Sequence, residues 1–252
     1  LYLFTTNKGA LFMSVWFMPE VVPNALIRVF CFSYAGGGAS TFRSWPRDAS
    51  LGVVPVQLPG RENRMGEAPL TSMSEVVEQV AEAMKPWIGT PYALFGHSLG
   101  ARIAFEVARF MRLHGESLPI HLFVSGSRSP EIPEPRPLHD LDEDEFFMEL
   151  SRYGGTSHRF LENREIRKIF LPMLRADFTV DETYLYREEE PLNIPITAFS
   201  GSEDKEAHAF EMKGWKKQTS LDFRQYEIPG NHFFVTHSSS LLVMHIREVL
   251  GV

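Results

Sequence analysis

The chain has little cysteine, no long hydrophobic run and no excess of basic residues. Its one cysteine, Cys31, forms no disulfide within the chain, so the composition favours a reducing, cytoplasmic location. No apolar stretch approaches the roughly 20 residues that span a bilayer, and the N-terminus lacks the pattern of a signal peptide. The formal net charge of −7 argues against general binding to nucleic acid or to an anionic membrane.

Short apolar runs alternate with segments of helical periodicity, which is typical of a mostly parallel sheet flanked by helices. The predicted strands are 27–32, 53–58, 92–95, 121–125, 196–200 and 223–228. The predicted helices include 73–87, 101–114 and 239–250. At 252 residues the chain is long enough for one large α/β domain. The sequence does not begin with Met, and residues 1–12 are interpreted as a candidate N-terminal extension before a start at Met13.

This alternation is interrupted between residues 130 and 192. Four prolines between 130 and 137 end the preceding strand pattern, and three helical segments follow at 144–150, 166–175 and 178–186. We therefore predict a core made of residues 13–129 and 193–252, with a helical lid inserted at 130–192 over the C-terminal edge of the sheet. The aromatic residues of the insertion predict an apolar acyl pocket, although most are individually expected in the core of the lid: Phe146, Phe147, Tyr153, Phe160, Phe170, Phe178, Tyr184 and Tyr186.

The pentapeptide Gly96-His97-Ser98-Leu99-Gly100 has the pattern of a nucleophile elbow. It lies between a predicted buried strand and a predicted helix. Glycine is needed at both ends because a Cβ there would collide with the crowded turn. The N-terminus of the following helix stabilises negative charge that develops at the serine. Ser98 is thus the predicted nucleophile of an α/β-hydrolase fold, the alternative being a structural turn.

A serine nucleophile needs a base, and the base needs an acid that orients it. In this fold the chain order is serine, acid, histidine. His232 is the predicted base because it follows the last predicted strand and precedes the last helix, and His237 is its nearest rival. The acid is expected after the preceding strand, where Asp204 is favoured. Glu203 and Asp177 are alternatives, and the acidic run at 203–206 can also be read as a solvated turn.

Three consecutive glycines, Gly36–Gly38, follow the first predicted strand. They could cradle a phosphate, but the sequence here matches neither Gly-Lys-Ser/Thr nor Gly-x-Gly-x-x-Gly. Beside a nucleophile elbow, an oxyanion hole is the better interpretation. Its predicted donors are the backbone N–H groups of Ala35 and Leu99.

Together these segments resemble one family, the type II (external, editing) thioesterases of nonribosomal peptide and polyketide biosynthesis. The matching motifs are, in order, Ser33-Tyr34-Ala35-Gly36-Gly37, Gln57-Leu58-Pro59-Gly60-Arg61-Glu62, Gly96-His97-Ser98-Leu99-Gly100, Leu174-Arg175-Ala176-Asp177-Phe178 and Gly230-Asn231-His232-Phe233-Phe234. Ser33 stands where the family commonly has Pro, and Asn231 stands where it commonly has Gly. The resemblance covers about residues 16–250.

The resemblance implies an enzyme of antibiotic biosynthesis that hydrolyses acyl groups from the phosphopantetheine thiol of acyl or peptidyl carrier proteins. It implies an acyl-Ser98 intermediate, with His232 acting as base and then acid and with Asp204 stabilising the imidazolium. No metal or diffusible cofactor is expected, because the covalent route supplies the chemistry. Members of the family usually act as monomers, and we expect the same here.

Other readings use the same residues. A carboxylesterase or lipase would use this triad on oxyesters, and an acyltransferase would pass the acyl group to an alcohol or amine. A non-catalytic binding module would require a broken triad. Arg61 and Arg64 are read either as solvated charge or as residues that clamp their loop or dock an acidic carrier protein.

Overall fold

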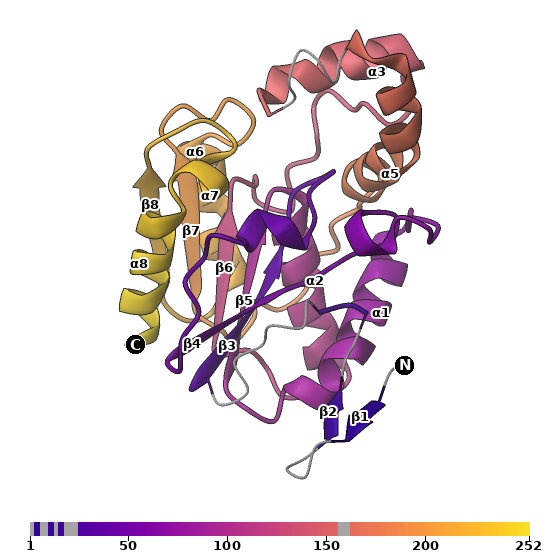
Figure 1. The fold of residues 1–252 in the computed structure, drawn as a ribbon. Coiled ribbons are helices and arrows are strands. Elements are labelled where there is room, and N and C mark those ends of the chain that lie inside the picture. The colour runs from indigo at the N-terminus through magenta and orange to yellow at the C-terminus, as the bar shows by residue number, and fades with distance from the viewer. Residues whose placement is uncertain (1–2, 6–9, 13–14, 18–24, 156–161) are drawn as a thin grey trace.

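A six-stranded sheet forms the centre of the molecule (Figure 1). The computed structural model describes residues 3–5, 10–12, 15–17, 25–155 and 162–252, so Met13 and Phe160 lie outside the described residues. The strands of this sheet are all parallel and follow the order β4-β3-β5-β6-β7-β8. Their bounds are β3 Ile27–Phe32, β4 Leu51–Pro55, β5 Tyr92–His97, β6 His121–Ser125, β7 Ile196–Gly201 and β8 Phe223–Ile228. The predicted parallel sheet is therefore confirmed.

The predicted bounds are correct for β3, β6 and β8, and β4 differs most. It ends at Pro55 instead of continuing to residue 58. After Pro55 the chain pairs with the segment that precedes β3. Val56 forms an isolated antiparallel β-bridge with Phe17, and the Gln57 N–H donates to the Trp16 carbonyl at 2.8 Å. A proline is tolerated here because β4 is an edge strand with a partner on one side only.

Helices cover both faces of the sheet and bury its side chains. On one face, α1 (Met73–Met84) and α2 (Leu99–Leu113) pack on the strands through apolar residues such as Val80 and Ile103. On the other face, α8 (Ser239–Leu250) packs through Leu242 and Ile246. Short helical turns complete the connections: η1 Ala39–Phe42, η2 Glu62–Arg64, η3 Lys85–Trp87, α6 Ala209–Met212, η5 Lys213–Gln218 and α7 Phe234–His237. Cys31 lies fully buried in the central layer.

The segment between β6 and β7 carries α3 (Glu143–Leu150), η4 (Ser151–Tyr153) and α5 (Arg164–Glu182). Figure 1 shows α3 beyond the carboxyl ends of the strands. A small hydrophobic core of its own holds this segment together: Leu138, Phe146, Phe147, Leu150, Met173, Leu174 and Phe178. Two helices were predicted where one long helix, α5, occurs. Asp177, which separates the two predicted helices, lies inside α5 because Arg61 neutralises its buried carboxylate.

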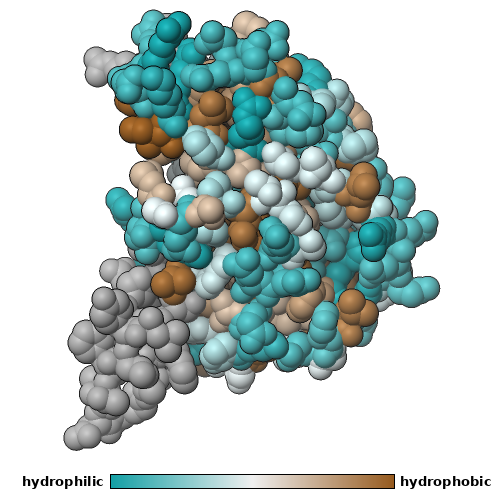
Figure 2. All heavy atoms as spheres, turned by 90° about the vertical axis from the view of Figure 1, so that its right-hand side faces the viewer, coloured by the Kyte–Doolittle hydropathy of each residue, from teal (hydrophilic) through white to brown (hydrophobic). Residues whose placement is uncertain are grey.

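Residues Leu3–Thr5 (β1) and Ala10–Phe12 (β2) pair with each other as a separate antiparallel ribbon. They belong to the segment interpreted as a candidate extension. The face of the molecule turned toward the viewer in Figure 2 is largely hydrophilic, with scattered hydrophobic residues. Among the described residues, no helix combines the length and apolar character that crossing a membrane requires.

Candidate active site

Ser98 lies in a strained turn between β5 and α2. Its φ of 57° and ψ of −123° are unfavourable for a residue with a side chain, at a cost of about 1–3 kcal/mol. The flanking glycines make this turn possible: a Cβ on Gly96 would lie 2.0 Å from the Gly100 carbonyl oxygen. A Cβ on Gly100 would lie 2.3 Å from the Phe32 carbonyl oxygen. The geometry is that of the nucleophile elbow expected from the sequence.

The side chains of Ser98, His232 and Asp204 form a chain of hydrogen bonds in that order. His232 Nε2 is 3.1 Å from Ser98 Oγ, and His232 Nδ1 is 3.1 and 3.0 Å from the two carboxylate oxygens of Asp204. A carboxylate only accepts, so Nδ1 carries the proton and donates to Asp204, leaving Nε2 free to accept from the serine hydroxyl. This arrangement can activate a serine for nucleophilic attack.

Asp204 is 4 % exposed and remains ionised. Burial by itself raises the pKa of this carboxyl, but the hydrogen bond and charge of His232 and the Glu206 N–H together lower the pKa below its usual value of 3.8. The N–H groups of Glu206 and Ala207 donate to Oδ1 at 2.9 and 3.2 Å and fix the carboxylate. A negative charge is therefore available to stabilise an imidazolium at His232.

The residues weighed as alternatives lie elsewhere. Glu203, next to Asp204, is exposed, as is His237 at the end of α7. Asp177 is buried in an ion pair with Arg61. None of these three has a hydrogen bond to Ser98 or His232 within the described ranges.

The predicted oxyanion donors flank the serine. Leu99 is the first residue of α2, where a backbone N–H has no intrahelical acceptor. Ala35, in the loop after β3, lines the same pocket as Ser98. The neighbouring Gly36 N–H is already used, since it donates to Asp177 Oδ2 at 2.7 Å. The Ala35 N–H has no hydrogen bond among the described residues, so it remains the predicted donor of this loop.

Arg61 and Arg64 are 4 % and 6 % exposed, so their interpretation as solvated charge is wrong. Docking of a carrier protein by these two side chains is also excluded by their burial. Both clamp their loop instead: Arg61 binds Asp177, while Arg64 donates to the Gln57 carbonyl at 2.9 Å and stacks on Trp16. Hydrogen-bond acceptors surround both guanidinium groups and compensate for the water that each charge loses on burial.

A pocket of about 370 Å³ opens above Ser98. Its walls mix apolar side chains of the insertion with the loop after β3 and the His232 loop. The lining includes Tyr34, Ala35, Leu150, Tyr153, Phe170, Met173, Leu174, Phe178, His232 and Phe233. Three of the aromatic residues that predicted an apolar pocket (Tyr153, Phe170 and Phe178) therefore lie in its wall, whereas Phe146 and Phe147 are buried in the core of the insertion.

The comparisons with known proteins agree with this geometry. A model of the thioesterase domain family matches residues 27–249. The chain belongs to the thioesterase family. It is 43 % identical over 227 residues to the gramicidin S biosynthesis protein GrsT of Aneurinibacillus migulanus, covering 88 % of this chain and 89 % of GrsT.

Solved structures give the same assignment. The RedJ thioesterase of the prodiginine pathway of Streptomyces coelicolor superposes with a TM-score of 0.82 at 39 % identity, covering 88 % of this chain and 85 % of RedJ. YbtT, the type II thioesterase of the yersiniabactin NRPS/PKS pathway, superposes with a TM-score of 0.83 at 32 % identity, covering 92 % and 95 % of the two chains. The resemblance to type II thioesterases is thereby confirmed.

Sequence reasoning missed the part played by His97 in this thioesterase. His97 is fully buried, its Nε2 lies 2.7 Å from the His232 carbonyl oxygen, and its Nδ1 lies 2.9 Å from Ser125 Oγ. A carbonyl only accepts, so Nε2 carries the proton and Nδ1 accepts from the Ser125 hydroxyl. The signal was present in the sequence: a polar residue at the end of a buried strand, inside the elbow itself, must find partners.

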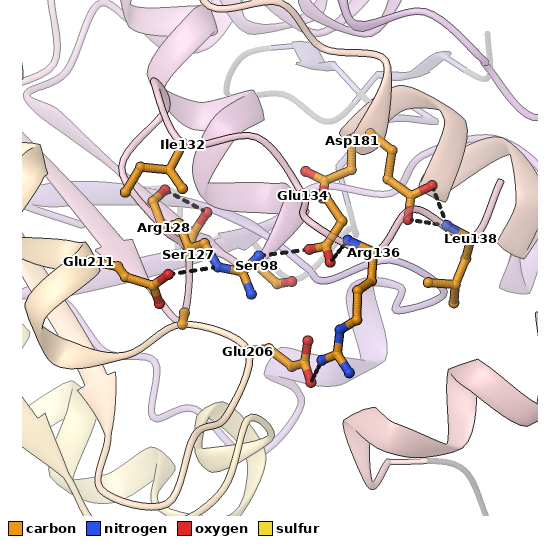
Figure 3. A network of polar contacts seen from close by, with 12 residues as sticks. Ser98, Ser127, Arg128, Ile132, Glu134, Arg136, Leu138, Asp181, Glu206 and Glu211 are labelled. Atoms are coloured by element: carbon orange, nitrogen blue, oxygen red, sulfur yellow. Dashed lines mark hydrogen bonds and ion pairs between the residues drawn. The ribbon is translucent and has the colours of Figure 1, made fainter.

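An ionic network that sequence reasoning also missed links the insertion to the loop that carries Asp204. Arg128, which follows β6, binds Glu134 at 2.7 Å and Glu211 at 3.3 Å, and Figure 3 shows these contacts beside Ser98. Arg152 in η4 reaches Glu206 at 3.4 Å. No sequence pattern predicts the Arg128–Glu211 and Arg152–Glu206 pairs, because they join segments far apart in the chain.

Tyr153 of the insertion packs directly on His232. Its ring lies 5.6 Å from the His232 ring and 5.7 Å from the Phe178 ring, measured between centroids. Its hydroxyl accepts from Arg152 Nη2 at 3.2 Å. The insertion of this thioesterase therefore covers one side of the His232 imidazole. Among the described residues, His, Cys, Asp and Glu side chains form no group of three or more suited to a metal ion.

Proposed function

We propose that this thioesterase releases acyl groups from the phosphopantetheine thiol of acyl or peptidyl carrier proteins in nonribosomal peptide or polyketide biosynthesis. The observation that carries the proposal is the hydrogen-bonded series Ser98–His232–Asp204 at the base of a partly apolar pocket. The relatives support it: YbtT is described as a type II thioesterase of an NRPS/PKS pathway. An oxyester hydrolase or an acyltransferase is not favoured by relatives of this kind.

In the first half-reaction, Ser98 Oγ attacks the thioester carbonyl carbon while His232 Nε2 takes the hydroxyl proton. The carbonyl oxygen becomes an oxyanion, for which the N–H groups of Ala35 and Leu99 are the donors. Loss of one such donor typically costs about 2.7–4 kcal/mol of transition-state stabilisation. The C–S bond then breaks, and the leaving thiol takes the proton from His232. The product is acyl-Ser98.

In the second half-reaction, His232 takes a proton from water, which attacks the acyl-Ser98 carbonyl. The C–O bond to the serine breaks, and the Ser98 oxygen recovers its proton from the imidazolium. A free carboxylic acid leaves. Asp204 stays ionised and stabilises the imidazolium in both halves. The chemistry proposed here requires no cofactor beyond the phosphopantetheine that the carrier protein brings.

The division of labour along the chain is part of the proposal. Residues 13–129 and 193–252 supply the α/β-hydrolase core, and 130–192 act as the lid. The pocket lining supports this role of 130–192, because it includes Leu150, Phe170 and Phe178 of that segment. We expect the enzyme to act as a monomer.

A second hollow adjoins the acyl pocket and suits the phosphopantetheine arm. It has a volume of about 820 Å³ and shares Tyr34, Gly36, Phe170 and Met173 with the first pocket. Its wall mixes hydroxyl groups with apolar side chains, as an arm with amide and methyl groups requires. Arg43 at its rim is exposed and forms no ion pair with any residue that the structure describes. Its guanidinium is placed to meet the phosphate or an acidic carrier surface.

Intact-mass spectrometry of an acyl-loaded carrier protein tests the proposal. Wild-type enzyme should remove the mass of the acyl group, and Ser98→Ala should leave the carrier loaded. Ser240→Ala, at an exposed serine of α8, is the matched control and should behave as wild type. If Ser98→Ala strips the carrier as fast as wild type, Ser98 is not the nucleophile. Transfer of the acyl mass to an added alcohol or amine would indicate an acyltransferase instead.

A further inference from the structure

Two motifs of the sequence that the catalytic triad leaves unused meet in the structure. Arg61, after β4, and Asp177, in α5, form a buried bidentate ion pair. Their Nη1–Oδ2 and Nη2–Oδ1 distances are 2.6 and 2.7 Å. Arg61 is 4 % exposed and Asp177 is 2 % exposed. Burying such a pair is weak evidence for stability, since desolvation offsets the attraction. The contacts around the pair indicate what else it does.

Both members of the pair hold the glycine loop after β3. Asp177 Oδ2 accepts the Gly36 N–H at 2.7 Å, and Arg61 Nη1 donates to the Gly37 carbonyl at 3.1 Å. Two successive residues of the loop are thus fixed by opposite charges of one ion pair. Gly36 has a φ of 82°, so it depends on these bonds to select one conformation from the many that glycine allows.

The residue next to this anchor is Ala35. The Gly37 N–H donates to the Tyr34 carbonyl at 2.8 Å, and in a trans peptide the N–H points away from the carbonyl. The Tyr34–Ala35 peptide therefore turns its carbonyl into the loop and the Ala35 N–H outward. Within the described part of the chain, the Ala35 N–H donates to no acceptor, while Ala35 lines the pocket above Ser98.

We propose that Arg61 and Asp177 are positioning residues for the oxyanion hole: they hold Gly36 and Gly37 so that the Ala35 N–H faces the reacting carbonyl. This inference rests on the proposed use of Ser98 as nucleophile. Neither side chain lines the pocket above Ser98, whereas Arg61 borders the hollow proposed for the phosphopantetheine arm. Their effect is greatest when negative charge develops on the carbonyl oxygen, because preorganised donors act on the transition state rather than on the bound substrate.

The test compares two ligands that carry the same hydrocarbon chain. A trifluoromethyl ketone forms a tetrahedral anion with Ser98, whereas the corresponding thioether binds without reacting. For Asp177→Asn and Arg61→Lys, we expect kcat and the affinity for the ketone to fall in parallel, by about 10- to 100-fold. The KM and the affinity for the thioether should stay within about 2-fold of wild type.

Arg102→Lys is the matched control. Arg102 in α2 also anchors α5, through Asp181 at 3.1 Å, and has no hydrogen bond to the loop after β3 among the described residues. This variant should keep the wild-type ratio of ketone to thioether affinity. Equal losses for both ligands in Asp177→Asn, or a wild-type kcat, would overturn the proposal.

A second route avoids variants that fail to fold. Replacing Gly36 by glycolic acid exchanges the N–H that donates to Asp177 for an ester oxygen and leaves every side chain unchanged, and it should lower the ketone affinity selectively. Unchanged ketone affinity in the folded ester variant would also overturn the proposal. None of these measurements uses a carrier protein. A failure of the proposed activity on carrier proteins can therefore be distinguished from a failure of this inference.

Discussion

His97 Nε2 lies 2.7 Å from the carbonyl oxygen of His232 and ties the backbone at His232 to strand β5, which leads into Ser98. Burial, followed by the charge of His232, lowers the pKa of His97 to about 3. The imidazole is therefore neutral in the folded enzyme at any pH near neutrality. In the unfolded chain the same side chain titrates near its usual value of about 6.5.

The first prediction is a pH-dependent stability that His97 causes. Below pH 6.5 the His97 imidazole binds a proton in the unfolded chain but not in the folded chain, so the free energy of unfolding falls as the pH falls toward 3. Between pH 7.5 and 5.0, His97 should account for about 2 kcal/mol of lost unfolding free energy. Urea denaturation at both pH values measures this, and His97→Gln should reduce the loss by that amount.

His114→Gln, at an exposed histidine, is the control and should lose as much stability as wild type. His121 makes its own contribution, because burial and the charge of Arg224 lower its pKa to about 4. An equal loss in His97→Gln and in wild type would contradict the assignment of this effect to His97.

The second prediction separates the two neighbouring carboxylates. Asp204→Asn should lower kcat by about 10³- to 10⁴-fold, because an amide cannot stabilise the imidazolium and favours the wrong tautomer. Glu203→Gln should leave kcat unchanged, since Glu203 is exposed and outside the hydrogen-bonded series. Steady-state hydrolysis of an acyl-pantetheine thioester measures both. A larger loss in Glu203→Gln would mean that the acid is assigned wrongly.

The third prediction concerns the elbow. Gly100→Ala should prevent folding or strongly lower the unfolding temperature, because its Cβ would lie 2.3 Å from the Phe32 carbonyl oxygen and 2.6 Å from the Ser33 carbonyl oxygen. These are backbone atoms, which cannot move aside cheaply. Gly89→Ala, where nothing lies within 4 Å of the added Cβ, should stay within about 1 kcal/mol of wild type. Thermal unfolding followed by circular dichroism compares them, and similar unfolding temperatures would refute the steric argument.

The fourth prediction tests the route of the arm. Arg43→Glu should raise KM for an acyl-loaded carrier protein by about 10-fold, equivalent to about 1.4 kcal/mol. Hydrolysis of acyl-pantetheine without a phosphate should be unaffected. Arg187→Glu, a charge reversal at another exposed arginine beside a different hollow, should leave KM for both substrates unchanged. If the two variants raise KM equally, general charge rather than the rim of this groove is responsible.

Local patterns of the sequence predicted the elements that depend on near neighbours. The elbow around Ser98 and the strands β3, β6 and β8 follow from spacing and periodicity alone. The loop positions of His232 and Asp204 follow from their places after strands. The interior of α5 did not follow, because a helix that continues through a buried aspartate requires Arg61, which is distant in the sequence.

The contacts of His97 and the network of Arg128 escaped prediction for the same reason. A hydrogen bond to the His232 carbonyl exists only after β5 and the loop after β8 are brought together. Whether Arg61 is solvated or buried depends on α5 covering it. Charge and motif indicate that such residues need partners, but only the tertiary structure supplies the partner's identity.

Leu174 links substrate choice to reactivity. Its side chain lines the acyl pocket, and its Cδ2 occupies the space beside Gly36, only 2.6 Å from where a Cβ would lie. A larger residue at position 174 would press on the loop that holds Ala35, and a smaller one would remove one of the contacts that support that loop. Engineering of acyl-chain preference at Leu174 is therefore expected to alter turnover as well.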